Sequence, residues 1–548
     1  MAKTVIVGAV AAGMSAATRL RRLDEHAHIV VLEAGEHVSF ANCGLPYYVG
    51  GVISERSALL LQTPASLHER FNLDVRVNSR VTAIDTFAKT VAVHGPDGEY
   101  LESFDNLVLT PGARPVVPDI PGAERALTLR DVGDADRLAD AVAGSRTAVV
   151  IGAGFVGLEV AENVARRGLA VTVVELAPQV LGALDAEMAV RIQDALEANG
   201  VRVLTGARAQ SIDASGVHVT TSDADELFVD ADVVVAAIGV RPDSQLAANA
   251  GLALSPQGAI LTDEDGRTSA PSVYAAGDAA AKRDALTGNS RNIPLANLAN
   301  RHGRRIADAI AGLPTKGRPS TGTAIVSVFG KVAAMAGHSE RVLRAAGREV
   351  RVIHTHPMDH AGYFPGAQQM AIKLIVDPAT NRILGAQAVG GAGVDKRIDV
   401  IATAMAGGIT ASELADLELA YSPEFGSAKD PVNMLGYVAE NLSDGLTPAI
   451  QWHDLAGLNA AAIIDVRSPA EHARGAVDGA VNIPLDELRV RHDELPTSGT
   501  IVVHCQVGQR GHTATRLLRQ RGYDAVNLDG GWLTWRDGVR TLTPVGAA

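Results

Sequence analysis

The chain has 548 residues, of which 47% are hydrophobic and 20% are charged. This length predicts about three or four domains, and the composition is typical of an α/β enzyme and excludes a disordered chain. The net charge of −13 disfavours nucleic acid or an anionic membrane as the main partner. Only two cysteines are present and the chain opens on an apolar strand, so we expect a cytoplasmic protein without disulfides or membrane anchor.

A pattern of strand, glycine turn, helix, strand and acidic residue occurs twice, beginning at residue 4 and at residue 148. Glycines in such a turn let the backbone approach a pyrophosphate at a helix N-terminus, and the acid can accept a hydrogen bond from a ribose hydroxyl. The two copies therefore predict two dinucleotide sites. The expected cofactor contacts are Gly8, Gly13 and Glu33 in the first copy, and Gly152, Gly154, Gly157, Glu159 and Glu175 in the second. The first turn departs from G-x-G-x-x-G, because Val10 occupies its middle position.

A third segment, residues 268–278, places Asp278 just after a strand and a glycine. It resembles the second FAD fingerprint of the flavoprotein disulfide reductases, in which this carboxylate bonds the ribitol chain. Pro111 and Gly112 resemble the crossover that leaves the FAD domain, and Gly239 its counterpart in the NAD domain. The resemblance implies an FAD-binding domain in two parts, an inserted NAD(P)H-binding domain and a dimer-interface domain. The expected boundaries are 1–115 and 246–322 for FAD, 116–245 for NAD(P)H and 323–445 for the interface.

Cys43 has no second cysteine nearby, because Cys505 lies more than 400 residues away. A single redox cysteine must pair with a thiol from outside the chain or cycle through an oxidised form of its own. The segment 39–48 resembles the coenzyme A-disulfide reductases, which implies a mixed disulfide between Cys43 and coenzyme A. An NADH oxidase or peroxidase that uses a Cys43 sulfenic acid is the alternative. Those enzymes carry a histidine in the first glycine turn, where this chain has Val10.

The same resemblance assigns contacts with coenzyme A. They are expected at Ser15, Arg19, Arg22, Ser39, Asn42, Asn300 and Lys429. Arg19 and Arg22 are three residues apart and so share a helix face; two guanidiniums suit phosphates, although a solvated face would look the same. Tyr363 and Tyr421 resemble the tyrosines that a second subunit contributes for proton transfer at the sulfur. The protein is therefore expected to be a homodimer.

The pattern changes after residue 445. Two apolar strands, 462–466 and 500–503, precede a loop in which Cys505 stands at the start of an expected helix. Backbone N–H groups and the helix dipole at such a position favour a thiolate and stabilise an anion beside it. Arg510 adds a cation for an anionic sulfur donor. Residues 446–548 resemble a rhodanese sulfurtransferase domain, which implies that Cys505 carries sulfane sulfur. A buried structural cysteine is the alternative.

Three histidines, His354, His356 and His360, suggest a metal site, but no nearby cysteine or fourth ligand completes a usual one. We expect no metal there, and expect these rings to line the region near Tyr363.

The combined prediction is an α/β protein with two nested Rossmann-like FAD and NAD domains, an α+β interface domain and a C-terminal α/β rhodanese domain. The predicted activity is FAD-dependent reduction of a persulfide, a polysulfide or coenzyme A disulfide. NADH is expected rather than NADPH, because Glu175 would repel a 2′-phosphate. Outside the reductases, the alternative is a sulfur-carrier module that passes persulfide to partner proteins.

Overall fold

The structure is a computed structural model that describes residues 2–542. The chain forms two compact units: Met1–Leu176 with Ala207–Gly322, and Ala177–Gly206 with Thr323–Ala548. Among the described residues, no helix combines the length and the apolar character needed to cross a bilayer. Both units combine helices with strands, as expected for the α/β class.

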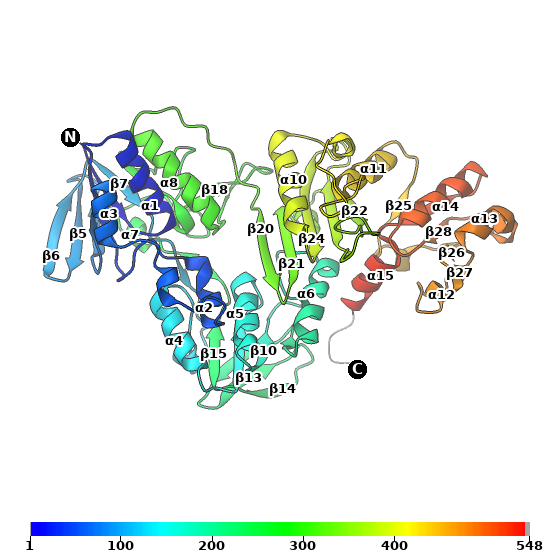
Figure 1. The fold of residues 1–548 in the computed structure, drawn as a ribbon, viewed down its shortest axis with the longest axis horizontal. Coiled ribbons are helices and arrows are strands. Elements are labelled where there is room, and N and C mark those ends of the chain that lie inside the picture. The colour runs from blue at the N-terminus through cyan, green and yellow to red at the C-terminus, as the bar shows by residue number, and fades with distance from the viewer. Residues whose placement is uncertain (1, 543–548) are drawn as a thin grey trace. The chain divides into compact units, whose positions relative to one another are not determined.

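A five-stranded parallel sheet carries the first glycine turn, with the strand order β17-β7-β1-β2-β3. Its strands are β1 Lys3–Val7, β2 His28–Leu32, β3 Asp74–Arg76, β7 Asn106–Leu109 and β17 Val273–Ala275. The central strands are runs of apolar residues because other elements cover both faces of the sheet. Helices α1 Ala11–Leu23 and α8 Ala296–Ile310 pack against each other on one face (Figure 1). The loops that carry the predicted flavin contacts leave from the carboxyl ends of β1, β7 and β17.

The second glycine turn follows a parallel sheet of the same kind. Strand β9 Thr147–Ile151 pairs with β10 Ala170–Val174 on one side and β15 Val233–Ala236 on the other. Helix α5 Phe155–Arg166 starts at the turn and packs on β9 and β10. The repeat of the βαβ pattern in the sequence is therefore a repeat in the structure.

Shorter elements complete the first unit. Its other helices are α2 Leu45–Val49, α3 Pro64–Phe71, α4 Val132–Val142 and α7 Gln245–Asn249, with 3₁₀ turns η1 Asn42–Gly44, η2 Arg56–Leu59, η3 Ala123–Arg125 and η4 Gly277–Ala279. Its antiparallel strands are β4 Arg80–Asp85, β5 Thr90–Gly95, β6 Gly98–Ser103, β12 Arg208–Ile212, β13 Gly216–Thr220, β14 Glu226–Asp230, β18 Lys282–Arg283 and β19 Ser290–Arg291. Strands β8 Ala113–Pro115 and β16 Val240–Pro242 pair antiparallel, so the two expected crossover segments lie side by side.

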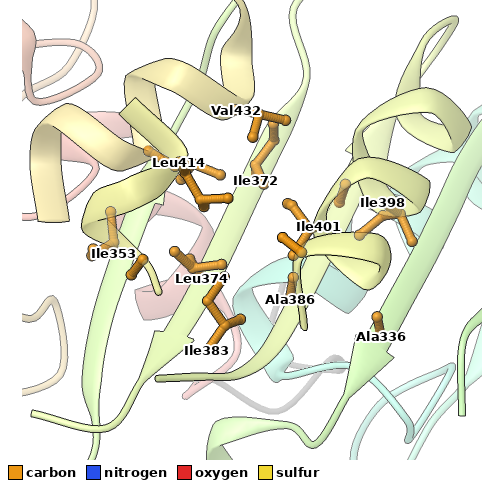
Figure 2. Packing of buried hydrophobic residues seen from close by; sticks show 14 of the residues in the cluster. Ala336, Ile353, Ile372, Leu374, Ile383, Ala386, Ile398, Ile401, Leu414 and Val432 are labelled. Atoms are coloured by element: carbon orange, nitrogen blue, oxygen red, sulfur yellow. The ribbon is translucent and has the colours of Figure 1, made fainter. Parts of the chain in front are cut away.

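The second unit is built first on an antiparallel sheet with the order β20-β21-β24-β23-β22. Its strands are β20 Ala324–Val328, β21 Lys331–Gly337, β22 Arg351–Thr355, β23 Ala371–Val376 and β24 Ile383–Gly390. The helices of this part are α6 Ala186–Ala198, α9 Glu340–Ala345, α10 Val394–Gly407 and α11 Pro431–Ser443, with strand β11 Arg202–Leu204 and turn η5 Ser412–Asp416. Side chains such as Ile372, Leu374 and Ile401 fill the space between the sheet and helices α10 and α11 (Figure 2). Burying each such side chain contributes about 1.5–3 kcal/mol.

A five-stranded parallel sheet ends the chain, with the order β25-β29-β28-β26-β27. Its strands are β25 Ala449–Ile450, β26 Ala462–Asp465, β27 Val481–Asn482, β28 Ile501–His504 and β29 Ala525–Leu528. The helices around it are α12 Pro469–His472, α13 Leu485–Arg491, α14 Gln509–Gln520 and α15 Gly531–Arg540, with 3₁₀ turns η6 Leu455–Gly457 and η7 His492–Glu494. Cys505 follows the central strand β28 directly, so the fold places it where a parallel sheet opens its loops.

Candidate functional site

Two positions of the first glycine turn accept only glycine. Gly8 has a φ of +98°, and a Cβ on it would lie 2.3 Å from the carbonyl oxygen of Thr110. A Cβ on Gly13 would lie 1.9 Å from the carbonyl oxygen of Gly8. Val10 caps helix α1 with a φ of −110°, outside the region that favours glycine. The departure from the usual motif at Val10 therefore causes no left-handed strain.

The second turn repeats this arrangement and leaves room at its middle position. Gly152 has a φ of +105°, and a Cβ on Gly157 would lie 2.1 Å from the carbonyl oxygen of Gly152. A Cβ on Gly154 would have no heavy atom within 4 Å. Helix α5 begins at the next residue, Phe155, with its unpaired N–H groups at this open space. The turn therefore fits an anionic pyrophosphate.

The two acids that end the second strand of each βαβ pattern make the same hydrogen bond. Glu33 Oε2 accepts from the Ala9 backbone N–H at 2.8 Å, and Glu175 Oε2 accepts from the Ala153 N–H at 2.6 Å. Each carboxylate therefore lies against its own glycine turn. This is the position from which such an acid bonds the ribose of a dinucleotide, so the donor set fits one dinucleotide at each turn.

The expected flavin contacts gather in the first unit. Asp278 lies half-buried in turn η4, and a Cβ on Gly277 would meet Ala12 of helix α1 at 3.4 Å. The Lys282 ammonium donates to the carbonyl oxygens of Gly277 and Ala280 at 2.5 and 2.8 Å. Burial lowers the pKa of Lys282 to about 8, although the charge of Asp278 acts the other way. The turn that presents Asp278 is thus tied down from both sides.

The glycines of the two crossover segments lie at opposite ends of the β8–β16 pair, where the Gly112 carbonyl accepts from the Asp243 N–H and the Gly239 carbonyl from the Val116 N–H, both at 2.9 Å. Gly112, which follows Pro111 and precedes β8, has a φ of +80°, and Gly239, which precedes β16, has a φ of +119°. Because β8 and β16 pair antiparallel from Ala113 with Pro242 to Pro115 with Val240, the structure pairs the two crossover segments but does not bring Gly112 and Gly239 together.

Cys43 is exposed in turn η1, in a segment whose backbone is locally strained. Ser39, four residues before it, has a φ of +48° and donates its N–H to the Ala9 carbonyl at 2.8 Å. Such strain in a non-glycine residue is typical of functional sites. Asn42 belongs to the same turn as the thiol. The segment is therefore anchored to the first glycine turn.

Burial and two carboxylates raise the pKa of the Cys43 thiol. Burial by the protein packed against one side of the thiol raises the pKa of Cys43 most, and the charges of Glu159 and then Asp278 raise it further. Glu159 was expected among the dinucleotide contacts, and the structure places its charge at Cys43 as well. Sequence reasoning did not assign Tyr47, whose hydroxyl lies 3.4 Å from Glu159 Oε1. The sequence feature that could have pointed to Tyr47 is its position in the segment 39–48 around Cys43.

Glu159 itself sits in an environment that favours its neutral form. Burial raises the pKa of Glu159 to about 7, the hydrogen bond from Tyr47 lowers it, and the charge of Glu162 raises it. The same contacts raise the pKa of Tyr47 to about 12, with burial as the largest cause. A carboxyl group with a pKa near neutrality can hold or release a proton beside a reacting sulfur.

The residues expected to contact coenzyme A are partly brought together on helices α1 and α8. Ser15 Oγ donates to Asn300 Oδ1 at 2.7 Å. Arg19 is paired with Asp308 through an Nε to Oδ1 contact of 2.7 Å, whereas Arg22 is exposed. Asp308 was not identified from the sequence. Its charge reduces what Arg19 can offer to a phosphate, so the two arginines are not equivalent.

Tyr363 and Tyr421 form a pair in the second unit. Their hydroxyl groups lie 3.2 Å apart, and the residues are 77% and 49% exposed. Lys429 is exposed as well. Neighbouring exposed aromatic side chains are typical of interaction surfaces. The structure thus joins the two tyrosines that sequence reasoning treated as counterparts.

The C-terminal sulfur loop encloses its cysteine. Cys505 is fully buried between β28 and α14, and its carbonyl accepts the Trp532 N–H at 2.8 Å. Gly508 caps α14 with a φ of +91°, a left-handed conformation that glycine adopts without steric cost. Burial in a loop at a helix N-terminus suits a small anionic sulfur species rather than a bulky group.

Arg510 does not stand alone in this loop. Its guanidinium makes a two-pronged contact with Glu471, at 2.9 and 2.6 Å. This hydrogen bonding lowers the pKa of Glu471 to about 2 and raises the pKa of Arg510, to which Cys505 also contributes. Sequence reasoning did not assign Glu471 a role. Its carboxylate balances the arginine that was expected to face an anion.

The three histidines lie in a different place from the one expected. His354 and His356 are buried and contact Asp529 and Thr534 of the C-terminal part. Only His360 lies in the segment of Tyr363, with Nδ1 3.1 Å from Asp359. The expectation of a polar lining near Tyr363 is therefore wrong for His354 and His356. Strand alternation does point both rings the same way, but toward the C-terminal part of the unit.

The comparisons with known proteins cover nearly the whole chain. Residues 2–303 match the family described as pyridine nucleotide-disulphide oxidoreductase, residues 323–431 match its dimerisation domain, and residues 450–537 match the rhodanese-like domain. The coenzyme A disulfide reductase of Staphylococcus aureus (strain JH9) is 32% identical over 447 residues, which are 80% of this chain and 100% of that protein.

Two solved structures match in fold as well as in sequence. Reduced CoADR-RHD of Bacillus anthracis is 43% identical, with a TM-score of 0.96 over 98% of both chains. A NAD-dependent persulfide reductase from A. fulgidus is 39% identical, with a TM-score of 0.91 over 97% of this chain and 100% of that chain.

Proposed function

The chain belongs to the pyridine nucleotide-disulphide oxidoreductase family, and we propose that it is an FAD-dependent, NADH-consuming reductase of persulfides and of coenzyme A disulfide. The single observation that carries this proposal is the pair of unlike sulfur sites. Cys43 is exposed beside a carboxyl group with a pKa near 7, and Cys505 is enclosed in an anion-binding loop. The resemblance to coenzyme A-disulfide reductases with a rhodanese domain is confirmed by the relatives.

The glycine turns and their acids would hold the two dinucleotides. Gly8, Gly13, Glu33 and Asp278 serve FAD, and Gly152, Gly154, Gly157 and Glu175 serve NADH. Once bound, these cofactors supply the electron pair that opens a disulfide at Cys43. Glu175 would favour NADH, because a carboxylate at the end of this strand would repel the 2′-phosphate of NADPH.

Cys43 is the nucleophile of the reductive half-reaction. Its thiolate attacks the coenzyme A-bearing sulfur of a persulfide, forms a mixed disulfide with coenzyme A and releases hydrosulfide. With coenzyme A disulfide, the same attack releases one coenzyme A thiolate. Two electrons then cleave the mixed disulfide and return the Cys43 thiolate and a coenzyme A thiolate. Ser15, Arg19, Arg22, Ser39, Asn42 and Asn300 position coenzyme A for this attack.

A second copy of the chain completes the site in a homodimer. Residues 323–431 match a dimerisation domain, and the exposed pair of Tyr363 and Tyr421 sits in it. A phenol hydrogen-bonded to a second phenol can protonate a leaving thiolate. Lys429, which is exposed in the same domain, offers a cation to the phosphates of coenzyme A.

Cys505 would handle sulfane sulfur. Its thiolate attacks the outer sulfur of a donor, forms a persulfide and releases the donor thiolate, so no external oxidant is needed. Gly508, the start of α14 and Arg510 stabilise the negative charge of that persulfide. The sulfur is then passed on to coenzyme A for reduction at Cys43.

The test is anaerobic consumption of NADH by the purified protein with coenzyme A persulfide and, separately, with coenzyme A disulfide, while sulfide is measured. We expect both to be reduced, with sulfide released only from the persulfide. The Cys43→Ser variant should reduce neither, and Cys505→Ser should still reduce coenzyme A disulfide. Rapid oxidation of NADH by oxygen or peroxide alone would instead identify an oxidase that uses a Cys43 sulfenic acid.

A further inference from the structure

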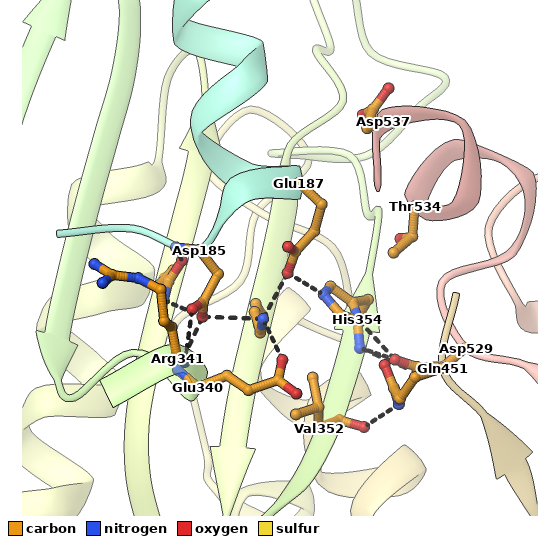
Figure 3. A network of polar contacts seen from close by, with 12 residues as sticks. Asp185, Glu187, Glu340, Arg341, Val352, His354, Gln451, Asp529, Thr534 and Asp537 are labelled. Carbon is orange, nitrogen blue, oxygen red and sulfur yellow. Dashed lines mark hydrogen bonds and ion pairs between the residues drawn. The ribbon is translucent and has the colours of Figure 1, made fainter. Parts of the chain in front are cut away.

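A buried histidine joins the sheet of the second unit to the turn that supports the Cys505 loop. His354 lies on β22, and its Nδ1 is 2.7 Å from Asp529 Oδ2 while its Nε2 is 3.1 Å from Glu187 Oε1 (Figure 3). The His354 backbone N–H also donates to both Asp529 oxygens, at 3.2 and 3.0 Å. Side chains from three separate parts of the chain thus meet at one imidazole.

The two ring nitrogens each face a carboxylate, so both must donate and the ring is an imidazolium. Burial alone would lower the pKa of His354, but the hydrogen bonds to Asp529 and Glu187 outweigh it and raise the pKa to about 9. His354 is therefore cationic at neutral pH.

The charges around the ring require this cation. Lys373 on β23 lies 2.9 Å from Asp185, 2.5 Å from Glu187 and 2.7 Å from Glu340, all buried. With Asp529, four buried carboxylates thus face the two buried cations Lys373 and His354, and Arg344 also pairs with Glu340 at 2.6 Å. The remaining charged or titratable groups nearby are His356 and Asp537, with Arg191 and Arg536. The Lys373 ammonium lies among the three carboxylates Asp185, Glu187 and Glu340, so this cluster is not a metal site.

Asp529 begins the turn that holds the sulfur loop. The turn runs from the end of β29 to the start of α15, and its next residues donate to the loop: Trp532 N–H to the Cys505 carbonyl at 2.8 Å and Leu533 N–H to the Gln506 carbonyl at 3.1 Å. A Cβ on Gly531 would lie 2.4 Å from the Cys505 carbonyl oxygen. The turn and the Cys505 loop are therefore packed backbone against backbone, so we expect a displacement of residues 529–533 to displace the backbone of Cys505.

We propose that His354 is a positioning residue for sulfur transfer at Cys505, acting through Asp529 and the turn 529–533. The inference rests on the proposed sulfurtransferase role of Cys505. In this arrangement the sheet of the dimerisation domain, rather than the rhodanese-like domain alone, sets the geometry of the sulfur loop. Without the cation, Asp529 would be a buried carboxylate without a charge partner, and the turn would move to solvate it.

Other contacts keep the domain in place when His354 is changed. His356 Nε2 lies 2.7 Å from Thr534 Oγ1, Arg191 pairs with Asp537 at 2.6 Å, and Arg540 pairs with Asp194 at 2.6 Å. The Gln451 amide also donates to the Val352 carbonyl at 3.0 Å. A variant at position 354 can therefore alter the loop without undocking the domain.

The test compares two amides in the full-length protein. In His354→Asn the side-chain amide stands near the position of Nδ1 and can still donate to Asp529, whereas in His354→Gln it stands near Nε2 and reaches Glu187 instead. The assay is thiocyanate formation from thiosulfate and cyanide. Cys505 attacks the outer sulfur of thiosulfate, sulfite leaves with the electron pair of the broken S–S bond, and cyanide removes the sulfur from the persulfide.

We expect kcat for thiocyanate formation to fall about 10- to 100-fold in His354→Gln, because displacement of a reacting group by about 1 Å has effects of this size. KM for thiosulfate should change little, and His354→Asn, which loses the charge but keeps a donor to Asp529, should lose less of the rate than His354→Gln. FAD content and NADH-dependent reduction of coenzyme A disulfide should be unchanged in both. The control Asp194→Asn, at the exposed pair with Arg540, should match wild type.

Equal rates in His354→Gln and wild type, or equal losses in the two amide variants, would overturn the inference. A pH profile of the wild type is a second test, which does not depend on whether His354→Gln folds. The imidazolium is lost as pH rises through about 9, so kcat for thiocyanate formation should fall there in the wild type. His354→Asn should not show this fall. The same fall in kcat near pH 9 in His354→Asn and in the wild type would also overturn the inference. No transfer by the wild type would instead overturn the role of Cys505 in the proposed function.

Discussion

The Tyr47 hydroxyl lies 3.4 Å from the Oε1 of Glu159, and this half-buried carboxyl group and the phenol both belong to the surroundings of Cys43. Charge on Glu159 raises the pKa of the Cys43 thiol, after the larger effect of burial. Because the pKa of Glu159 is itself about 7, the reactivity of the thiol is coupled to a proton held on helix α5.

Removing this charge should make Cys43 more acidic. In Glu159→Gln the pKa of the Cys43 thiol should fall, because the carboxylate that opposes its ionisation is gone while an amide can still meet Tyr47. The measurement is the rate of iodoacetamide labelling at Cys43 against pH, with Cys505→Ser as the background. An unchanged or higher midpoint would show that Glu159 does not act on the thiol.

The two glycines of the second turn should respond in different ways to one added methyl group. Gly157→Ala should destabilise the protein by about 1–3 kcal/mol, because the Cβ would lie 2.1 Å from the Gly152 carbonyl oxygen. Gly154→Ala should leave thermal stability close to wild type, since no atom lies within 4 Å of its Cβ. It should raise KM for NADH instead, because the methyl group enters the expected pyrophosphate space. Comparable melting temperatures for the two variants would contradict this assignment.

Neutralising Glu175 should relax the choice of nicotinamide cofactor. In the wild type the Ala153 N–H donates to the Glu175 carboxylate at 2.6 Å. Glu175→Gln retains an oxygen that can accept this hydrogen bond but carries no charge to repel a 2′-phosphate. We expect kcat/KM for NADPH to rise about tenfold, equivalent to roughly 1.4 kcal/mol. Glu175→Ala, which also loses the hydrogen bond to the turn, should lower kcat/KM for NADH. Steady-state kinetics with NADH and with NADPH measure this preference. An unaltered ratio of the two kcat/KM values in Glu175→Gln would count against a role for the Glu175 charge.

Lys373 should be essential to the stability of the second unit. Lys373→Met removes the cation that contacts all three carboxylates Asp185, Glu187 and Glu340, which should cost about 3–5 kcal/mol at pH 7.5. His354 still contacts Glu187, and Arg344 still contacts Glu340. Lys331→Met, on strand β21 of the same sheet, should change the free energy of unfolding by less than about 0.5 kcal/mol.

The loss in Lys373→Met should depend on pH. Although burial acts to raise them, Lys373 depresses the pKa values of Glu187 and Glu340, so the stability they contribute is present above their ordinary pKa and is lost as pH falls. Without Lys373 these carboxyls can take up protons at a higher pH, so the deficit should shrink between pH 7.5 and pH 5.5. Urea denaturation at the two pH values measures this, and a constant deficit would refute it.

The sequence by itself determined the features that depend on neighbouring residues. The glycines at 8, 13, 152 and 157, and the acids that end the next strands, follow from local backbone geometry, since a turn with a positive φ and close backbone contacts admits no side chain. The loop between β28 and α14 that holds Cys505 likewise depends on residues that are neighbours in the sequence. For this reason the fold class could be predicted without coordinates, and Cys43 and Cys505 could be proposed as the two sulfur sites.

Only the tertiary structure decided which charges meet. Glu159 lies 112 residues from Tyr47, Ser15 lies 285 residues from Asn300, and His354 lies 175 residues from Asp529. No sequence window contains such a pair, because contact depends on how whole helices and sheets pack. The pKa values and ion pairs that set the chemistry depend on burial and on charges a few ångströms away, and both arise only once the elements have packed.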